Sequence, residues 1–338
     1  MAHEVETMFS VREKPWHGLG RLLDNPPTSE EAIREAGLDW EVEKRDVYWK
    51  SQSEEGDNFV EIPNRCTLVR STDEKPLSLV SKNYSILQNS KAFEFFDPLI
   101  KQGYAEYETA GSLREGRKIW VLARIKESFQ IGPGDEIRQY VMLCNGHDGN
   151  TGVMVQPTPI RVVCDNTLTT SLAAGMVQTI YHRGDVAAQL DNAAELIGFT
   201  EAKFRELKQV FELLNEVKLD SDGRNNYLNA IIPPATENAG TRMRNRVEKD
   251  RSNIEYLLDH GKSVQVSGID RGTVWALYNC AVEYADWSMG SRSADLGNYQ
   301  LFGRGAAFKR HAFDCAVGVA EGRLDEVQGF EPALIQAQ

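Results

Sequence analysis

The side chains that could do chemistry lie close together between residues 144 and 172, in the stretch CNGHDGNTGVMVQPTPIRVVCDNTLTTSL. Cys144 and His147 are separated by two residues and Cys164 follows, a faint zinc-ligand pattern, but a structural zinc site needs four ligands in tight pairs. Cys164 with His147 and Asp148 could instead form a Cys–His nucleophile. Because a cysteine at the end of a strand-like RVVC is usually a small buried hydrophobic residue, neither pattern is favoured.

The same stretch has a structural interpretation. NGHDG is typical of a turn that needs positive φ angles, because Asn, Asp and Gly tolerate them, and we expect His147 to hold this turn through a side-chain hydrogen bond. Arg161 comes just before a helix start at Cys-Asp-Asn-Thr, and both arginine and helix N-termini favour phosphate. The alternative for Arg161 is an ion pair with Asp148 or Asp165.

Other basic residues are interleaved with aromatic ones, as in nonspecific binders of single strands. One group surrounds a predicted hairpin turn, and another lies in GRGAAFKRH, a predicted flexible loop that contacts DNA. The residues expected to contact phosphates are Arg161, Arg117, Lys118 and Arg124, with Lys309 and Arg310 as secondary contacts, and those expected to stack on bases or sugars are Trp120 and Tyr140. A further cluster, RMRNRVEKDR, lies on a predicted helix, where a solvated face is the more common interpretation.

Composition and charge narrow the class of protein. The 338 residues suffice for one large domain or two modest ones, and no apolar run approaches the roughly 18 residues of a membrane helix. The five cysteines without a CxxC pair indicate reduced thiols. The net charge of −12 is uneven, with −8 in residues 1–62, +1 in 63–175 and −5 in 176–338. A locally basic groove is therefore compatible with a protein that is acidic overall.

A meander of strands is the main feature that turns and periodicity predict. Residues 89–103 are typical of a helix, and residues 104–147 of three successive strands separated by glycine-containing turns. A fourth strand contains Pro157 and Pro159, which restrict it to a sheet edge or a bulge. A further helix is expected to start in DNTLTTSLAAGM, capped by Asp165 or Asn166. The predicted fold class is α+β, with a curved antiparallel sheet whose meander is followed by a helix.

Helices dominate the rest of the predicted layout. Thr28-x-x-Glu31 is a capping-box pattern that starts a short helix, and apolar residues recur at helical spacing through most of the chain after residue 184. We expect three regions: an N-terminal lead with a short helix and first strand at 1–62, an α+β core at 63–182 and a helical C-terminal region at 183–338.

Seven phrases occur in order along the chain: PWHGLG, GLDWEVEK, LVSKNYSILQNSKAFEFFDPL, TAGSLREGRKIWVLARI, NGHDG, PIRVVCDNTL and GTVWALYNCAVEYADW. Together they resemble the phage- and plasmid-encoded "phage/plasmid-like proteins", a domain of unknown function numbered 932, over nearly the whole chain. That family has no assigned activity to carry over. The order of helix, meander strands and helix is also similar to the Rad-type single-strand annealing proteins, which form rings that hold single-stranded DNA in a basic groove.

We therefore expect a phage- or plasmid-encoded, annealing-type recombination protein that binds single-stranded DNA in the cytoplasm of a bacterial host cell. It would be a homo-oligomer, with a ring as one form, and would use no cofactor, metal ion, membrane or enzymatic step, because a cationic groove can extend the backbone and leave base edges free. The N-terminus lacks the apolar core of a signal peptide. One alternative is a mobile-element protein that binds and inhibits or modifies a host defence complex, which the acidic flanks favour. A second alternative is a Cys-dependent hydrolase or transferase that uses Cys164 and His147.

Overall fold

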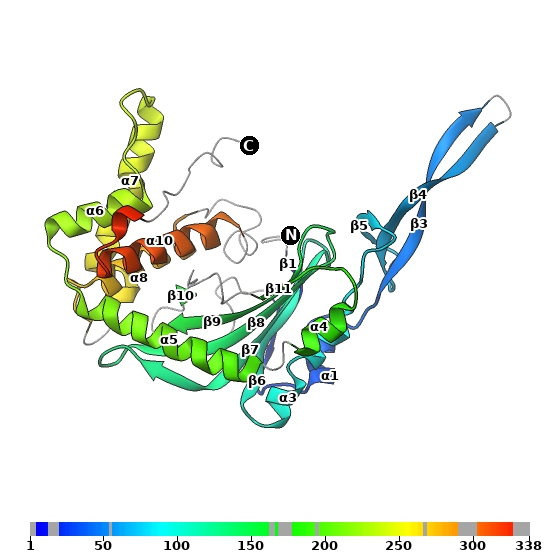
Figure 1. Cartoon of the computed structure of the whole chain (residues 1–338), viewed down its shortest axis with the longest axis horizontal. Helices are drawn as coiled ribbons and strands as arrows, with labels where there is room; N and C mark the ends of the chain where they lie inside the picture. The colour runs from blue at the N-terminus through cyan, green and yellow to red at the C-terminus, as the bar shows by residue number, and fades with distance from the viewer. Residues whose placement is uncertain are drawn as a thin grey trace. The chain divides into compact units, whose positions relative to one another are not determined.

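Two β-sheets and a set of helices make up the chain (Figure 1). The computed structural model describes residues 5–12, 20–53, 56–161, 166–167, 178–192, 196–265, 269–289 and 303–326. The contacts divide the chain into two compact units. Unit 1 comprises Met1–Lys126, Tyr140–Gln156 and Val177–Thr200, and unit 2 comprises Glu127–Gln139, Pro157–Met176 and Glu201–Gln338. The region boundaries expected from the sequence stay predictions. Among the helices described, none has the length and apolarity required to cross a bilayer.

The larger sheet has the strand order β10-β9-β8-β7-β6-β1-β2, with β11 paired to β9, and the smaller sheet has the order β3-β4-β5. The pair β1–β2 is parallel, and the other pairs with a defined register are antiparallel. The strands are β1 (Val5–Val11), β2 (Arg21–Leu23), β3 (Val42–Ser53), β4 (Gly56–Arg70), β5 (Pro76–Ser81), β6 (Ala105–Leu113), β7 (Lys118–Gln130), β8 (Glu136–Gly146), β9 (Val153–Arg161), β10 (Asn166–Thr167) and β11 (Gln178–Ile180). The fold is therefore mixed α+β with a mostly antiparallel sheet, and β6 to β9 are neighbours in sequence order.

The helices of the described residues are α1 (Ser29–Glu35), α2 (Asn89–Glu94), α3 (Asp97–Lys101), α4 (Val186–Asn192), α5 (Leu196–Glu216), α6 (Ser221–Ile231), α7 (Thr241–His260), α8 (Val274–Trp287) and α10 (Arg304–Ala320), with short 3₁₀ turns at Lys262–Val264 and Leu324–Glu326. The predicted capping box of α1 is present, since the Glu31 amide donates to Thr28 and the Thr28 amide donates to Glu31. The single helix predicted at 89–103 is two helices, α2 and α3. Pro98 lies in the first turn of α3, where its missing N–H costs no helical hydrogen bond.

The two prolines of β9 lie where the sequence placed them, away from a continuous partner strand. β11 pairs with Val153–Val155 and β10 pairs with Ile160 and Arg161, so Pro157 and Pro159 fall between these two short partners. The helix predicted to start at Asp165 or Asn166 is wrong at its start. Asn166 and Thr167 form β10, because they pair with Arg161 and Ile160 at the end of β9. The continuation of that predicted helix lies outside the described residues.

Each unit has its own core. In unit 1, α2 and α3 pack aromatic side chains against β6, where the hydroxyl of the buried Tyr107 donates to the Phe93 carbonyl at 2.9 Å. In unit 2, Phe211, Trp275 and Phe313 pack ring against ring. α8 is buried along nearly its whole length, which suits its apolar sequence.

Candidate functional site

The NGHDG segment at the end of β8 is a structural turn. The Asp148 carboxylate accepts hydrogen bonds from the backbone amides of Asn150 at 2.9 Å and Thr151 at 2.7 Å, and from the Thr151 hydroxyl at 2.8 Å. Gly149 has a φ of +76°, as the composition predicted. The expectation that His147 holds the turn is wrong, because Asp148 does so.

His147 reaches away from the turn and into the core of unit 1. It is fully buried, and its Nε2 lies 2.9 Å from Oδ1 of Asn89. The Asn89 amide nitrogen donates to the carbonyls of Leu38 and Trp40, so its Oδ1 must accept, and His147 carries its proton on Nε2. Burial, with a smaller contribution from His182, lowers the pKa of His147 to about 3. This histidine is therefore neutral, and its hydrogen bond to Asn89 joins the segment that follows β8 to the start of α2.

Neither bond-making alternative has a site among the described residues. Burial raises the pKa of the Cys144 thiol, which is therefore a thiol and not a nucleophilic thiolate. No group of three or more metal-ligating side chains gathers within the described part of the chain. Cys164 lies outside the described residues, so its predicted pairing with His147 stays a prediction.

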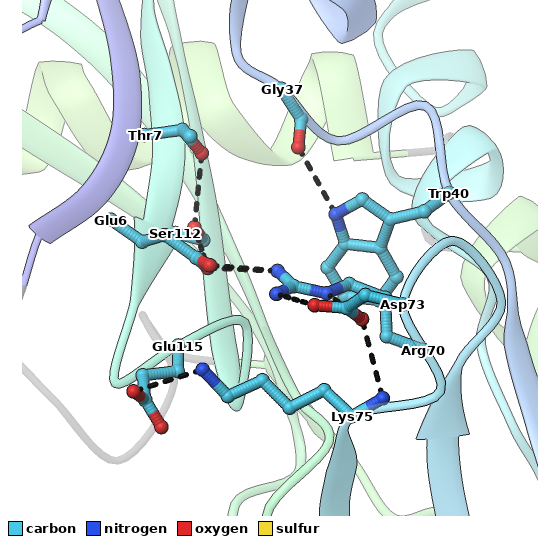
Figure 2. A network of polar contacts seen from close by, with 9 residues as sticks. All are labelled: Glu6, Thr7, Gly37, Trp40, Arg70, Asp73, Lys75, Ser112 and Glu115. Atoms are coloured by element: carbon cyan, nitrogen blue, oxygen red, sulfur yellow. Dashed lines mark hydrogen bonds and ion pairs between the residues drawn. The ribbon is translucent and has the colours of Figure 1, made fainter.

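A second polar cluster, around Arg70 at the end of β4, is also internal (Figure 2). The Arg70 guanidinium donates to both carboxylate oxygens of Asp73 and to Glu6 at 2.9 Å, and lies over the Trp40 ring, 5.5 Å from its centroid. Lys75 forms a separate ion pair with Glu115 at 2.9 Å. These contacts join β1, β4 and the turn after β4, so Arg70 serves the fold and not an outside anion.

The cations predicted to contact phosphate in unit 1 are only partly accessible. Arg117 is exposed in the turn between β6 and β7, and Lys118 follows it at the start of β7. The Lys118 ammonium lies 3.7 Å from Asp148, and the Arg124 guanidinium lies 3.8 Å from Glu106. Two of these three cations therefore have a carboxylate partner. The backbone of Arg161 pairs with Asn166, and its side chain lies outside the described residues.

Three other predicted contacts are wrong. Trp120 and Tyr140 are buried within the sheet, so they cannot stack on bases. Lys309 is 1% exposed, and its ammonium lies 2.8 Å from Asp286, so it cannot reach a phosphate. The expected loop GRGAAFKRH is mainly the first part of α10. Arg310, the next residue on that helix, is exposed.

Exposed cations also gather on α7, in the cluster that the sequence suggested was a solvated face. We call residues 241–251 the α7 arm. It holds five basic and two acidic residues, whereas the second half of the helix packs through Ile254 and Leu258. Arg242, Arg244 and Lys249 are exposed on the arm. Its first half is therefore a cationic surface on a helix anchored at its other end.

An apolar groove of about 460 Å³ runs beside the arm, and we call it the α7 groove. Two consecutive prolines after Ile232 end α6, because a residue before proline avoids the helical region, and the chain then turns back to α7. Two arginines and one carboxylate line the groove: Arg246, Arg304 and Asp250, with Arg246 and Asp250 3.8 Å apart. The apolar lining comprises Ile231, Ile232, Pro233, Pro234, Ala235, Ala239, Met243, Val247, Tyr284, Met289 and Phe308.

The α7 groove can hold a flat apolar group beside an anion. Its walls come from α6, α7, α8 and the start of α10, so residues distant in sequence meet there. Two features of the groove were visible in the sequence, namely the arginine-rich helix and the IIPPAT break. The sequence contained no signal that Arg304 and Tyr284 would join them.

Comparison with known proteins adds one finding about ancestry. The family model described as "Domain of unknown function (DUF932)" matches residues 76–302, about two-thirds of the chain. The match includes the α7 arm and most of the groove. No curated protein and no solved structure matches the chain.

Proposed function

This chain belongs to the DUF932 family, and we propose that it is a phage- or plasmid-encoded, annealing-type recombination protein that binds single-stranded DNA in the α7 groove. The observation that carries the proposal is the exposed arginine-rich arm beside an apolar groove. Proteins that bind single strands without reading sequence combine these two features, because cations hold the phosphates and apolar surface accepts the bases. This proposal includes no bond-making step.

Each part of the site has a separate task. Arg242 and Lys249 are exposed, lie seven residues apart on the same face of α7, and would each hold a phosphate. Arg246 and Arg304 line the groove and would neutralise phosphates that pass along it. Met243, Pro233 and Pro234 are exposed in the groove and offer surface on which a base or sugar can rest. Because these contacts hold the backbone and ring faces, the base edges stay free to meet a complementary strand.

Because the chain has a net charge of −12, DNA should be attracted only to the basic part of its surface. The overall negative charge repels DNA from most of the surface, so attraction depends on the cations of the arm. Arg117 and Arg310 are exposed and serve as secondary candidates. The proposal therefore predicts strong dependence on a few residues and on salt.

The test is fluorescence anisotropy with labelled single- and double-stranded oligonucleotides, titrated across salt. Each lost phosphate contact should reduce the slope of log affinity against log salt by about 0.7 for a single strand. The double variant Arg242→Gln/Lys249→Gln should therefore bind more weakly, with a slope shallower by about 1.4. An annealing assay with complementary oligonucleotides should show the same loss.

The matched control is Arg65→Gln/Arg183→Gln, which removes two exposed cations of unit 1 and the same charge. Its affinity and salt slope should stay close to those of the wild type. An unchanged slope in the folded arm variant, or an equal loss in the control, would assign DNA binding elsewhere. No binding at low salt by the wild-type protein would remove the proposal and favour a role in binding a host defence complex.

A further inference from the structure

The β3–β4 hairpin continues beyond the rest of its sheet as a two-stranded ribbon (Figure 1). β5 pairs with β4 only from Arg65 to Val69, whereas β3 and β4 stay paired as far as Ser53 and Gly56. We call residues 47–62 the distal ribbon. A two-stranded hairpin is marginally stable in water by itself, and its unpaired edges invite another chain.

The distal ribbon exposes large apolar side chains on both faces. Trp49 lies directly opposite Val60 on one face, and Phe59 and Tyr48 lie on the other. Phe59 is 67% exposed, and Trp49 and Tyr48 are each 52% exposed. Neighbouring exposed aromatic residues of this kind mark an interaction surface. Burial of either face would also supply the packed layer that a two-stranded ribbon needs for stability.

The charge of the distal ribbon indicates the kind of surface that would bind it. The ribbon has four acidic residues and Lys50 as its one basic residue, a net charge of −3. A partner should therefore offer an apolar recess with cations around it. The α7 arm, with a net charge of +3, and the α7 groove beside it have both properties.

We propose that the distal ribbon docks into the α7 groove of a second copy of this chain. An aromatic residue of the ribbon, Trp49 or Phe59, fills the apolar recess, and the net negative charge of the hairpin sequence favours the cationic arm. Such a contact joins two different surfaces, so a dimer keeps one free groove on one copy and one free ribbon on the other. The result is a head-to-tail assembly that grows with protein concentration. This inference goes beyond DNA binding and does not depend on it.

The two proposals share a groove and therefore predict competition. The ribbon resembles single-stranded DNA chemically, because both carry negative charge and flat apolar rings. If both bind there, an added oligonucleotide should dissociate the assembly. Self-association is measured without DNA, so its failure and the failure of DNA binding are separate results.

Sedimentation velocity of the full chain, over a wide concentration range at low and high salt, tests the inference. The ribbon variant is Trp49→Thr/Phe59→Thr, and the groove variant is Met243→Gln/Arg246→Gln. The wild type should assemble as its concentration rises and dissociate as salt rises, because opposite charges meet at the contact. Each variant should stay monomeric where the wild type is assembled.

Mixing the two variants distinguishes this contact from others. The groove variant keeps an intact ribbon and the ribbon variant keeps an intact groove, so an equimolar mixture should form a dimer and nothing larger. The matched controls are Tyr104→Thr, an aromatic residue that is 51% exposed elsewhere in unit 1, and Arg224→Gln, an exposed cation of α6. Both should assemble like the wild type, and circular dichroism should show all variants folded.

Three results would overturn the inference. A wild type that is monomeric at every concentration would leave the ribbon to a different partner, such as a host protein. Assembly of the groove variant at wild-type strength would indicate a symmetric ribbon–ribbon contact. Monomers of both variants without a dimer in the mixture would show that the two surfaces do not meet.

Discussion

His147 should make the stability of unit 1 sensitive to acid. The imidazole is fully buried, donates from Nε2 to Asn89 and has a pKa of about 3, against an ordinary value of 6.5. Burial is the main cause of this lowered pKa, His182 adds to it, and Asp148 opposes it. The unfolded chain can therefore bind a proton at a pH where the folded chain cannot.

The sign and size of the effect follow from these values. Above pH 6.5 the imidazole is neutral in both states, so its full contribution to stability is present. As the pH falls below 6.5, only the unfolded state binds the proton, and stability is lost by about 1.4 kcal/mol per pH unit. Near pH 5 the loss is about 2 kcal/mol. A change of one unit in the folded pKa barely alters this figure, because pH 5 lies well above it.

The measurement is the free energy of urea unfolding near pH 7.5 and near pH 5, for the wild type and His147→Gln. Glutamine keeps a donor toward Asn89 and removes the titration. Burial also lowers the pKa values of His182 and His311, but both occur in the two proteins and cancel in the comparison. The wild type should lose about 2 kcal/mol more than the variant. Equal losses in both proteins would refute a buried, neutral His147.

Two further predictions concern buried polar contacts. Arg70→Met should destabilise unit 1 by about 2–3 kcal/mol, because Glu6 loses its partner in a mostly buried setting while Asp73 is partly solvated; urea unfolding with Arg70→Lys as an intermediate case measures it, and an unchanged midpoint would contradict it. Trp275→Phe should cost unit 2 about 2–3 kcal/mol, because the buried Asp135 loses a hydrogen bond of 2.8 Å. Thermal unfolding checks this effect, and an unchanged melting temperature would show that other partners of Asp135 suffice.

The sequence predicted best those features whose signals lie within a few neighbouring residues. Thr28 and Glu31 form the predicted capping box because its hydrogen bonds lie within one helical turn. The meander strands and their glycine turns were found because apolar alternation and turn chemistry are also short-range. The prediction at Asn166 failed because a cap residue pairs equally well in a strand when a neighbouring strand end offers its backbone.

The candidate site depended on contacts that the sequence does not display. Trp120 and Tyr140 were assigned to DNA from their interleaving with cations, but the face that a strand residue presents to the core depends on the layers packed on it. Lys309 was assigned from its basic neighbours, and its burial depends on Asp286 on another helix. The exposed aromatic residues of the distal ribbon were missed, because alternating apolar residues predict a half-buried strand unless the partner layer is known to be absent.

The sequence by itself determined the family, the fold class, the strand meander and the basic character of α7, since each depends on residue order or on neighbours within a few positions. Only the tertiary structure decided which cations are exposed and which, like Lys309 beside Asp286, are buried. It also brought Arg304 and Tyr284 beside Arg246 to form the α7 groove. The physical reason is that burial and ion pairing are properties of packed surfaces, which residues far apart in the chain create together.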